Sequence, residues 1–269
     1  MTSMLERLTP PIRGLILDMD GVLWKDSSPI GDLHLIFDRF RERDLQVVLA
    51  TNNATQTIDE YLSKLRVFGV ILEPWQIVTS AEVIANVLLN AFPQKGAVYV
   101  VGENGIISAL CEKGFNPITD PNNETPVVAV IGGMDRSLTY QKLHRASSHI
   151  RAGAPFYGTN PDATFPTPMG LVPGAGSIIA AIETAAEAKQ TVIGKPASFM
   201  FELPAERMGL SKNEILVVGD RLETDIAGGQ GVGNRTALVL SGVSTLQQAL
   251  KWNPPPDLIA KDLSELMIA

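Results

Sequence analysis

Apolar residues along the chain form short continuous runs that alternate with segments of helical spacing. The runs at 15–17, 45–50 and 76–79 are typical of buried strands. Apolar positions within 33–40 and 61–65 recur three and four residues apart, which is the period of one helix face. The alternation predicts βαβαβ units, and therefore an α/β fold with a doubly wound parallel sheet.

The same alternation extends along the rest of the chain. Pro204 should kink or end a turn of its helix, because proline lacks the N–H that a helix interior needs. Residues 159–176 are rich in proline and glycine, which predicts an irregular linker or binding loop before a helix that Ser177 would cap. The further predicted strands are 97–101, 127–131, 155–158, 191–193, 215–218 and 236–240, and the helices 104–113, 139–151, 177–189 and 197–208.

Composition is that of an ordinary folded protein. Its 269 residues suffice for one large domain or two modest ones, and the 45% of hydrophobic residues supply a core. No stretch of about 18 uninterrupted apolar residues occurs, and residues 1–11 lack the apolar centre of a signal peptide. The net charge of −7 argues against a basic surface for nucleic acid. We therefore expect a cytoplasmic protein that binds neither membrane nor nucleic acid.

The single cysteine, Cys111, rules out an intramolecular disulfide. It stands between Leu110 and Glu112, which suggests a half-buried position on a helix, and no nucleophile signature surrounds it. The three histidines lie near no cysteine cluster, so we expect them to be ordinary surface or core residues.

Two acids follow the first predicted strand directly. Asp18 and Asp20 are two residues apart, so they share one face of an extended chain, and Gly21 lets the chain turn at once. Their like charges repel at close range, and a cation between them would relieve that repulsion. Mg²⁺ is a hard cation that takes oxygen ligands and keeps waters. Because D-x-D is a short motif, the pair alone equally fits a polar strand end without a ligand.

Three further polar fragments follow other predicted strands. Thr51 and Asn52 follow the second strand, Lys195 follows a short later strand, and Asp220 with Asp225 follows another. In open parallel sheets, ligands bind beyond the carboxyl ends of the strands, so one fold would bring all these fragments to one crevice. Acids suit a cation, whereas a hydroxyl, an amide and a lysine suit phosphate oxygens. The combination predicts a site for a phosphate held against a metal.

In this order the fragments resemble the four motifs of the haloacid dehalogenase (HAD) superfamily of phosphohydrolases. The segment between the second and third motifs resembles the cap of the NagD-like, 4-nitrophenylphosphatase subgroup (cap class IIA). The resemblance runs from about Gly14 to the C-terminus. The matching motifs are Asp18-Met19-Asp20-Gly21-Val22, Ala50-Thr51-Asn52, Gly194-Lys195-Pro196 and Gly219-Asp220-Arg221-Leu222-Glu223-Thr224-Asp225, with local matches at Thr159-Asn160-Pro161-Asp162 and Leu240-Ser241-Gly242-Val243-Ser244.

The resemblance implies the catalytic and metal-binding roles. Asp18 would be the nucleophile that attacks phosphorus and forms an aspartyl-phosphate. Asp20 would protonate the leaving oxygen and then deprotonate the water that hydrolyses the intermediate. Asp18, Asp220 and the backbone carbonyl of Asp20 would hold Mg²⁺ as the cofactor.

The resemblance also implies how the phosphoryl group is held. Thr51, Asn52 and Lys195 would bind it, and Lys195 would link it to Asp18. Asp225 would support this arrangement, either through a metal-bound water or by positioning Lys195.

The expected domains follow from the placement of the cap. Residues 1–80 and 173–269 would form the HAD-like catalytic core, and 81–172 a smaller inserted α/β cap. The cap would cover the site and select the leaving group, with Asn160, Asp162, Thr164 and Phe165 as candidate contacts. The expected partner is a small phosphorylated metabolite: a sugar phosphate, nucleotide monophosphate, phosphoglycolate-like compound or aryl phosphate. Caps of this subgroup often self-associate, which implies a homodimer.

Two other functional classes fit parts of the pattern. A phospho-accepting signalling receiver also places paired acids, a threonine and a lysine at strand ends, but it is shorter and has no large insert. A binding or scaffold protein of the same fold would show little turnover. The glycine-rich run 228–233 fails the spacing of a dinucleotide site and predicts a helix end and turn, and Trp24 fits either the substrate entrance or the core.

Overall fold

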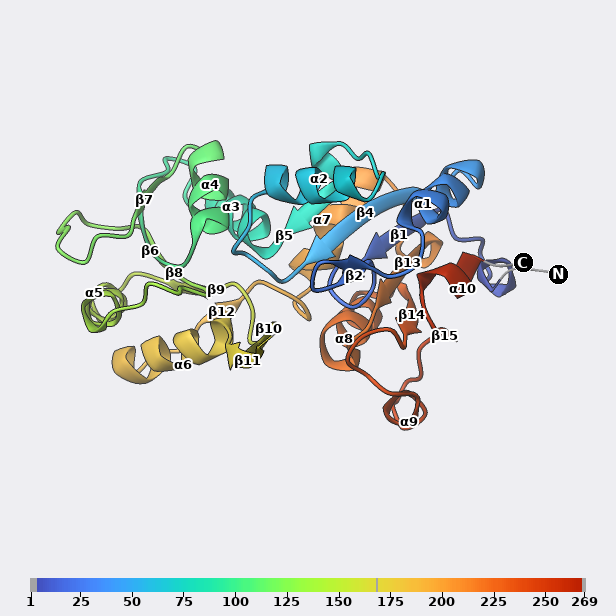
Figure 1. Cartoon of the computed structure of the whole chain (residues 1–269). Helices are drawn as coiled ribbons and strands as arrows, with labels where there is room; N and C mark the ends of the chain where they lie inside the picture. The colour runs from blue at the N-terminus through green and yellow to red at the C-terminus, as the bar shows by residue number, and fades with distance from the viewer. Residues whose placement is uncertain (1–3, 168, 268–269) are drawn as a thin grey trace. The chain divides into compact units, whose positions relative to one another are not determined.

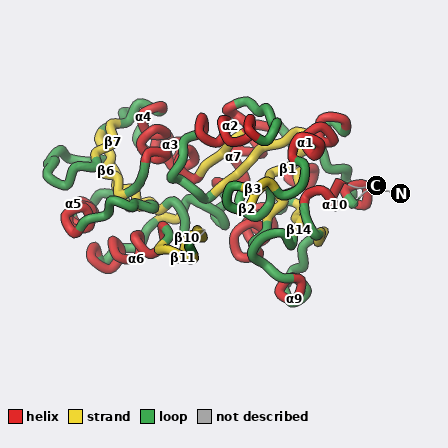
Figure 2. The backbone as a smooth tube through the Cα atoms, viewed as in Figure 1, coloured by secondary structure: helices red, strands yellow, loops and turns green. Residues whose placement is uncertain are grey.

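The protein, described here from a computed structural model over residues 4–167 and 169–267, divides into two compact units (Figures 1 and 2). The first unit combines the chain up to Thr51, the segment Asp59–Val78 and the chain from Lys195 onward. The second combines Asn52–Ile58 with Thr79–Gly194. Each unit has its own parallel sheet with helices, as the alternating pattern predicts.

The described residues of the first unit form a sheet in the order β15-β14-β13-β1-β4-β5. β1 lies inside it, with Leu17 paired to Val218 on one side and to Leu49 on the other. The pairings from β15 to β4 are all parallel. Every residue of β1 and β13 is buried, as expected for strands of a parallel sheet that is covered on both faces. The strands are β1 (Gly14–Leu17), β4 (Gln46–Thr51), β5 (Ile77–Thr79), β13 (Ile215–Gly219), β14 (Arg235–Val239) and β15 (Leu258–Ala260).

Helices cover both faces of this sheet. β4 and β5 lie on one side of β1 in the sheet, and β13, β14 and β15 lie on the other. Because connections between parallel strands are right-handed, the helices after β1 and β4 lie on one face of the sheet and those after β13 and β14 on the opposite face. α7 and α1 both pack against β4. The helices are α1 (Leu33–Glu42), α2 (Ile58–Val67), α7 (Phe199–Met208), α8 (Ala227–Val232), α9 (Leu246–Ala249) and α10 (Leu263–Met267).

Helix α1 shows how local sequence builds this layer. The Asp32 carboxylate accepts the N–H of Leu35 at 3.1 Å, which satisfies a backbone donor of the first turn. The apolar positions that the pattern picked out are buried on one face, and they are Leu33, Ile36, Phe37 and Phe40.

Shorter elements join these layers. A hairpin of β2 (Trp24–Lys25) and β3 (Ser28–Pro29) follows the two acids after β1. A π-helical segment, η4 (Leu222–Ile226), leads from β13 into α8. The 3₁₀ turns are η1 (Leu5–Arg7), η2 (Pro74–Gln76) and η3 (Lys212–Glu214).

The second unit has a parallel sheet in the order β12-β9-β8-β6-β7. Its core joins Tyr99 of the sheet to Ile179 and Ile182 of α6. The strands are β6 (Ala97–Val101), β7 (Asn116–Ile118), β8 (Ala129–Gly132), β9 (Phe156–Gly158) and β12 (Thr191–Val192), and the helices α3 (Ser80–Ala91), α4 (Asn104–Glu112), α5 (Tyr140–Arg151) and α6 (Ala175–Ala186).

The second unit extends further along the chain than the expected cap of residues 81–172. α6 packs against β8 and β9, and β12 pairs with β9, so residues 173–194 belong to this unit rather than to the core. The segment expected to be irregular contains an antiparallel hairpin of β10 (Thr164–Thr167) and β11 (Gly170–Pro173). The larger extent of this unit arises because β12 pairs with a strand that is distant in sequence, whereas the β10–β11 hairpin is a local pairing in a segment whose proline and glycine content is typical of loops.

Three local expectations also change. Ser177 lies inside the first turn of α6, where its hydroxyl donates to the Ala163 carbonyl at 2.6 Å, and Gly174 takes the N-cap position. α7 continues through Pro204 to Met208, without ending there. Cys111 is exposed rather than half-buried. In contrast, the glycine-rich run forms the end of α8, followed by Gly233 in the left-handed conformation, so the predicted helix end and turn are confirmed.

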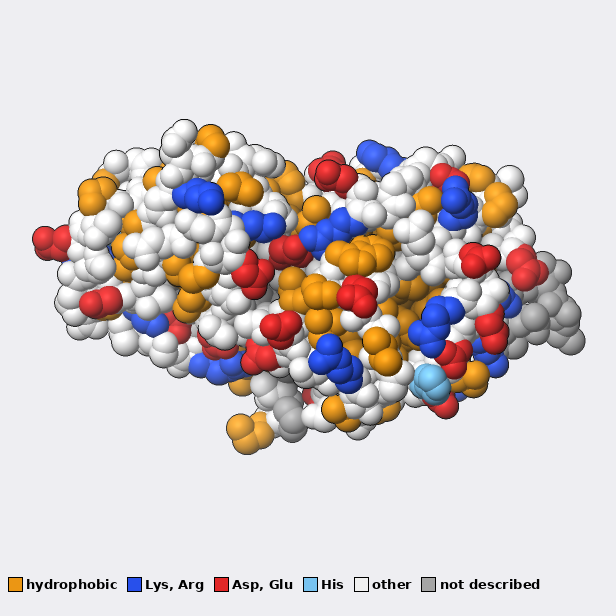
Figure 3. Space-filling view, turned by 90° about the horizontal axis from the view of Figure 1, so that it is seen from above, with side chains coloured by type: hydrophobic (Ala, Val, Ile, Leu, Met, Phe, Trp, Pro, Cys, Tyr) orange, Lys and Arg blue, Asp and Glu red, His pale blue; other side chains and the backbone are white. Residues whose placement is uncertain are grey.

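Two surface observations concern the expected partners. In the part of the chain that the structure describes, no helix is both long and apolar enough to cross a membrane. On the face shown in Figure 3, acidic and basic side chains are interspersed over the surface. That nucleic acid is not a partner stays a prediction.

Candidate active site

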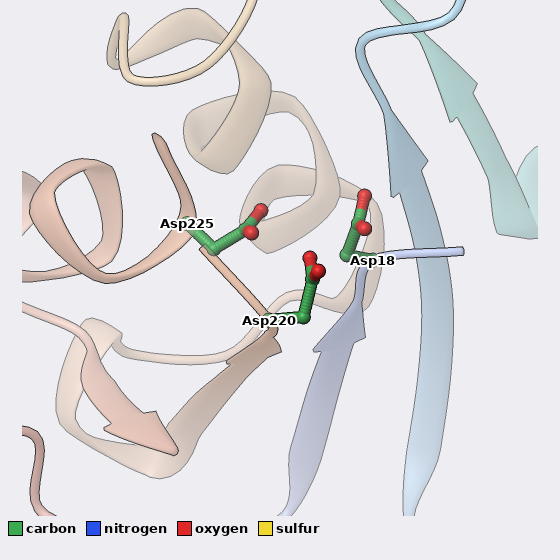
Figure 4. A group of neighbouring side chains, drawn as sticks. All are labelled: Asp18, Asp220 and Asp225. Carbon is green, nitrogen blue, oxygen red and sulfur yellow. The ribbon is translucent and has the colours of Figure 1, made fainter. Parts of the chain in front are cut away.

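Two acids leave the same edge of the first unit's sheet. Asp18 follows β1 and Asp220 follows β13, and these strands are parallel neighbours with Leu17 opposite Val218. Carboxylate oxygens of Asp18, Asp220 and Asp225 lie within 4.8 Å of one another. Figure 4 shows the three side chains pointing toward a common centre. The predicted convergence of these strand ends is therefore present in the structure.

Asp225 reaches the centre from the π-helical segment η4. Its Oδ2 accepts the N–H of Arg221 at 3.2 Å. A Cβ added at Gly219 would lie 2.1 Å from the Asp225 Cβ, so glycine is required at the end of β13 for this approach. The wider π turn and the missing Cβ together place the acid beside the strand end, and such π segments are frequent at functional sites.

Lys195 joins two of the three carboxylates. Its Nζ donates to Asp18 Oδ1 at 2.5 Å and to Asp225 Oδ1 at 2.7 Å, and only 3% of the residue is exposed. Burial acts to lower the pKa of Lys195, but the carboxylates of Asp18 and Asp225 outweigh it and raise that pKa above its ordinary value. Lys195 is therefore a fixed positive charge in this site.

The Asp220 carboxylate sits in a cradle of backbone. The Oδ2 atom accepts the N–H of Val243 at 2.7 Å, and the backbone carbonyl of Asp220 accepts the N–H of Ser244 at 3.0 Å. A Cβ at Gly21 would lie 2.5 Å from Oδ2, and one at Gly242 would lie 1.9 Å from it. Oδ1 is buried with no hydrogen-bond partner among the described residues. Oδ2 is thus held by the backbone, whereas Oδ1 stays available to bind a ligand.

Electrostatics show an excess of negative charge at this centre. Burial raises the pKa of Asp18 well above its usual range; Lys195 opposes this shift, while Asp225 and Asp220 add to it. Burial, with the Asp225 charge, raises the pKa of Asp220 to about 6. One lysine faces three carboxylates, so a further cation within reach of their oxygens would stabilise the ionised forms. The unpartnered Oδ1 of Asp220 and the all-oxygen donor set fit a divalent metal.

The remaining predicted site residues are placed as follows. Asp20 lies in the turn after β1, and its Oδ1 accepts the indole N–H of Trp24 at 2.9 Å. Thr51 is buried at the end of β4, the strand beside β1. Asn52 groups with the second unit, where its carbonyl accepts Asn160 Nδ2 at 2.8 Å.

The candidate cap contacts have partners within their own unit. The Asp162 N–H donates to Asn160 Oδ1 at 3.1 Å, and the Ser80 hydroxyl donates to the Asn52 carbonyl at 2.9 Å. Asn160 is buried, so its amide is engaged in holding the chain around Asn52. A contact between these residues and a substrate stays a prediction.

Sequence reasoning did not find two supporting features. By sequence Trp24 fits either the substrate entrance or the core; in the structure the residue is 1% exposed, and its indole N–H donates to Asp20. Gly242 matched the family pattern with no role attached, and the structure places it against Asp220. An aromatic four residues after an acid is a signal only when the intervening turn is known.

Comparison with known proteins agrees with this fold. The family "haloacid dehalogenase-like hydrolase" matches residues 15–116, and a second HAD-hydrolase-like family matches residues 192–266. An acid sugar phosphatase of Staphylococcus aureus is 34% identical over 94% of this chain and 96% of its own.

Solved structures of similar fold include proteins of the same family. NagD from E. coli K-12 superimposes with a TM-score of 0.85 and 31% identity, covering 94% of this chain and 98% of its own. A glycerol phosphate phosphatase from Mycobacterium tuberculosis, in complex with magnesium, has a TM-score of 0.89 and 30% identity, covering 99% of this chain and 78% of its own. The chain belongs to the haloacid dehalogenase-like hydrolases, and within them to the NagD-like phosphatases. The predicted resemblance and the doubly wound α/β fold are confirmed.

Proposed function

We propose that this phosphatase is a Mg²⁺-dependent hydrolase of small phosphomonoesters that acts through an aspartyl-phosphate on Asp18. The observation that carries the proposal is the single lysine shared by Asp18 and Asp225 beside the unpartnered buried oxygen of Asp220. Such a centre binds a cation and, with it, a phosphoryl group whose own negative charge the carboxylates would otherwise repel.

Asp18, Asp220 and the backbone carbonyl of Asp20 would hold the magnesium ion. Asp225 is engaged by Lys195 and by the Arg221 N–H, so it supports the lysine more directly than the metal. When bound, the cation offsets the charge on the carboxylates and on the phosphoryl oxygens. The magnesium complex of the mycobacterial relative supports this choice of metal.

The reaction then has two balanced steps. In the first, an Asp18 oxygen attacks phosphorus while the ester P–O bond breaks, and the departing oxygen takes the proton of the Asp20 carboxyl. In the second, water attacks the phosphorus of the aspartyl-phosphate, Asp20 takes the water proton, and the bond between phosphorus and the Asp18 oxygen breaks. Asp18 is regenerated, and inorganic phosphate leaves.

Other residues would hold the phosphoryl group during both steps. Lys195 is fixed beside the attacking oxygen by its 2.5 Å bond to Asp18. The Thr51 hydroxyl stands at the end of the neighbouring strand β4, and the amide of Asn52 follows it in sequence. Hydrogen-bond donors around phosphate oxygens stabilise the charge that spreads over them in the transition state.

The substrate class follows from the relatives rather than from the site alone. The relatives carry the names acid sugar phosphatase and glycerol phosphate phosphatase, which supports a small phosphorylated polyol or sugar as the substrate of this chain. The second unit would act as the cap that selects the leaving group.

Substitution of the proposed nucleophile tests the proposal. The assay is hydrolysis of p-nitrophenyl phosphate with Mg²⁺, together with mass spectrometry of acid-quenched protein. We expect wild-type protein to turn over and to carry a phosphoryl adduct on Asp18, and Asp18→Asn to lose both. The exposed Asp44→Asn variant is the control. Wild-type turnover by Asp18→Asn would overturn the mechanism.

A further inference from the structure

Among the described residues, one side chain donates a hydrogen bond to the Asp20 carboxylate. Trp24 Nε1 donates to its Oδ1 at 2.9 Å, although Asp20 itself is exposed. An indole N–H can only donate, so it engages a carboxyl oxygen that carries no proton. The contact therefore assigns the two oxygens different tasks: Oδ1 accepts from Trp24, and Oδ2 stays open for a proton.

Trp24 is itself fixed by the turn that carries both residues. The Met19 carbonyl accepts the N–H groups of Leu23 at 2.8 Å and Trp24 at 3.3 Å, and the Trp24 carbonyl accepts the N–H of Gly21 at 2.7 Å. Gly21 has a φ of +85°, a left-handed conformation that glycine adopts without strain. The backbone thus sets the spacing between the acid and the ring.

Two side chains of the segment after β4 hold the indole ring in place. The Lys64 ammonium lies 3.9 Å from the ring centroid of Trp24, and the Phe68 ring centroid lies 6.1 Å away. Lys64 also donates to the Asp26 carbonyl at 3.2 Å, which ties α2 to the hairpin of β2 and β3. A cation over an aromatic face and a neighbouring ring each favour one ring orientation. These contacts favour the ring orientation in which the indole N–H donates to Asp20.

We infer that Trp24 is a positioning residue that orients the Asp20 carboxyl for proton transfer to the leaving oxygen. The inference rests on the proposed function, in which Asp20 supplies that proton. Its consequence is selective. An alkoxide leaves poorly without a proton, so alkyl phosphates need an oriented acid, whereas nitrophenolate leaves as a stable anion and needs little help. Trp24 therefore extends the substrate range toward alkyl and sugar phosphates.

The variant Trp24→Phe removes the N–H and keeps an aromatic ring. kcat/KM reports only the steps up to formation of the aspartyl-phosphate, so it isolates the proton transfer to the leaving group. We expect kcat/KM to fall about 10- to 100-fold for glycerol phosphate, which is part of the roughly 10²- to 10⁴-fold that general acid catalysis contributes, and less than about threefold for p-nitrophenyl phosphate. Trp75→Phe, at a partly exposed tryptophan outside the site, should leave the ratio of the two substrates unchanged.

Two further variants separate positioning from structure. In an Asp20→Asn background, Trp24→Phe should produce no additional change in the substrate ratio. Should Trp24→Phe not fold, Phe68→Leu, which leaves both the N–H and the Lys64 charge but removes the ring beside the indole, should lower the ratio in the same direction. Equal losses for both substrates, or a persisting effect without Asp20, would overturn the inference. A wild-type protein inactive on both substrates would instead overturn the proposed function, and with it this inference.

Discussion

Lys195 lies between Asp18 and Asp225 and donates a hydrogen bond to each, at 2.5 Å and 2.7 Å. The lysine and Asp225 are both almost fully buried. The ammonium thus serves two purposes: it keeps the Asp18 carboxylate in place, and it neutralises charge that the fold has withdrawn from water. These purposes can be separated by substitution.

Replacing the lysine by an apolar side chain should damage both stability and activity. Lys195→Met leaves the buried Asp225 and the largely buried Asp18 without their counter-ion, which we expect to cost about 3–5 kcal/mol of unfolding free energy. Urea denaturation measures this loss. Adding Asp225→Asn should recover a large part of the stability, because one of the two buried charges is gone. Activity on p-nitrophenyl phosphate should not recover, and its return in the double variant would contradict a role for Lys195 in holding the phosphoryl group.

Gly242 should control metal affinity without contributing a ligand. In Gly242→Ala the new methyl group would lie 1.9 Å from Asp220 Oδ2, so the carboxylate must move. Loss of support behind a metal ligand typically lowers affinity 10- to 100-fold, and calorimetric titration with MgCl₂ measures this directly. Gly231→Ala is the matched control, because a Cβ there meets nothing within 4 Å. Equal magnesium affinity in both variants would show that the backbone around Asp220 does not determine metal affinity.

Asn160 should affect substrate use through Asn52. Its amide donates to the Asn52 carbonyl at 2.8 Å, and a hydrogen bond of this kind contributes about 0.5–1.5 kcal/mol. We therefore expect Asn160→Ala to lower kcat/KM for p-nitrophenyl phosphate by up to about tenfold. Asn122→Ala, at an exposed position, is the control. An unchanged kcat/KM in Asn160→Ala would mean that Asn52 needs no such support.

His149 should make the second unit sensitive to acid. Burial, with the Arg145 charge, lowers the pKa of His149 below 6.5, and its Nε2 is buried without a partner. The unfolded chain therefore binds the proton more readily than the folded one, and stability falls as the pH drops through about 6.5 toward the folded-state pKa. For one proton the slope is at most about 1.4 kcal/mol per pH unit.

Urea denaturation at pH 7.5 and pH 5.5 measures this effect. His149→Gln should lose less stability on acidification than the wild type. His144→Gln, at an exposed position of the same helix, controls for the loss of a histidine as such. A wild-type-like loss in His149→Gln would exclude the residue as a source of acid sensitivity.

The sequence predicted the strand ends of the site better than their surroundings. Asp18 and Asp220 each follow a fully buried strand. Because such strands are covered on both faces, they are continuous apolar runs in the sequence and can be recognised as parallel strands. Asp225 depends on a π turn, and the support of Asp220 depends on Gly242, more than 20 residues away in sequence. These relationships come from tertiary packing, which leaves no periodic signal. The same holds for β12, whose partner β9 lies about 30 residues earlier.

The pairing of β1 with β13 joins residues about 200 positions apart, because Gly14 faces Ile215. During translation, β1 and β4 are made early. β13, which pairs with the other edge of β1, lies in the last third of the chain and is made late. The second unit, nearly continuous in sequence, has all of its strands available before then. Long-range pairing of this kind slows folding and leaves an apolar edge open in the meantime. A truncated chain that ends before residue 215 should thus bind chaperones through its N-terminal strands, although every described strand of its inserted unit is present.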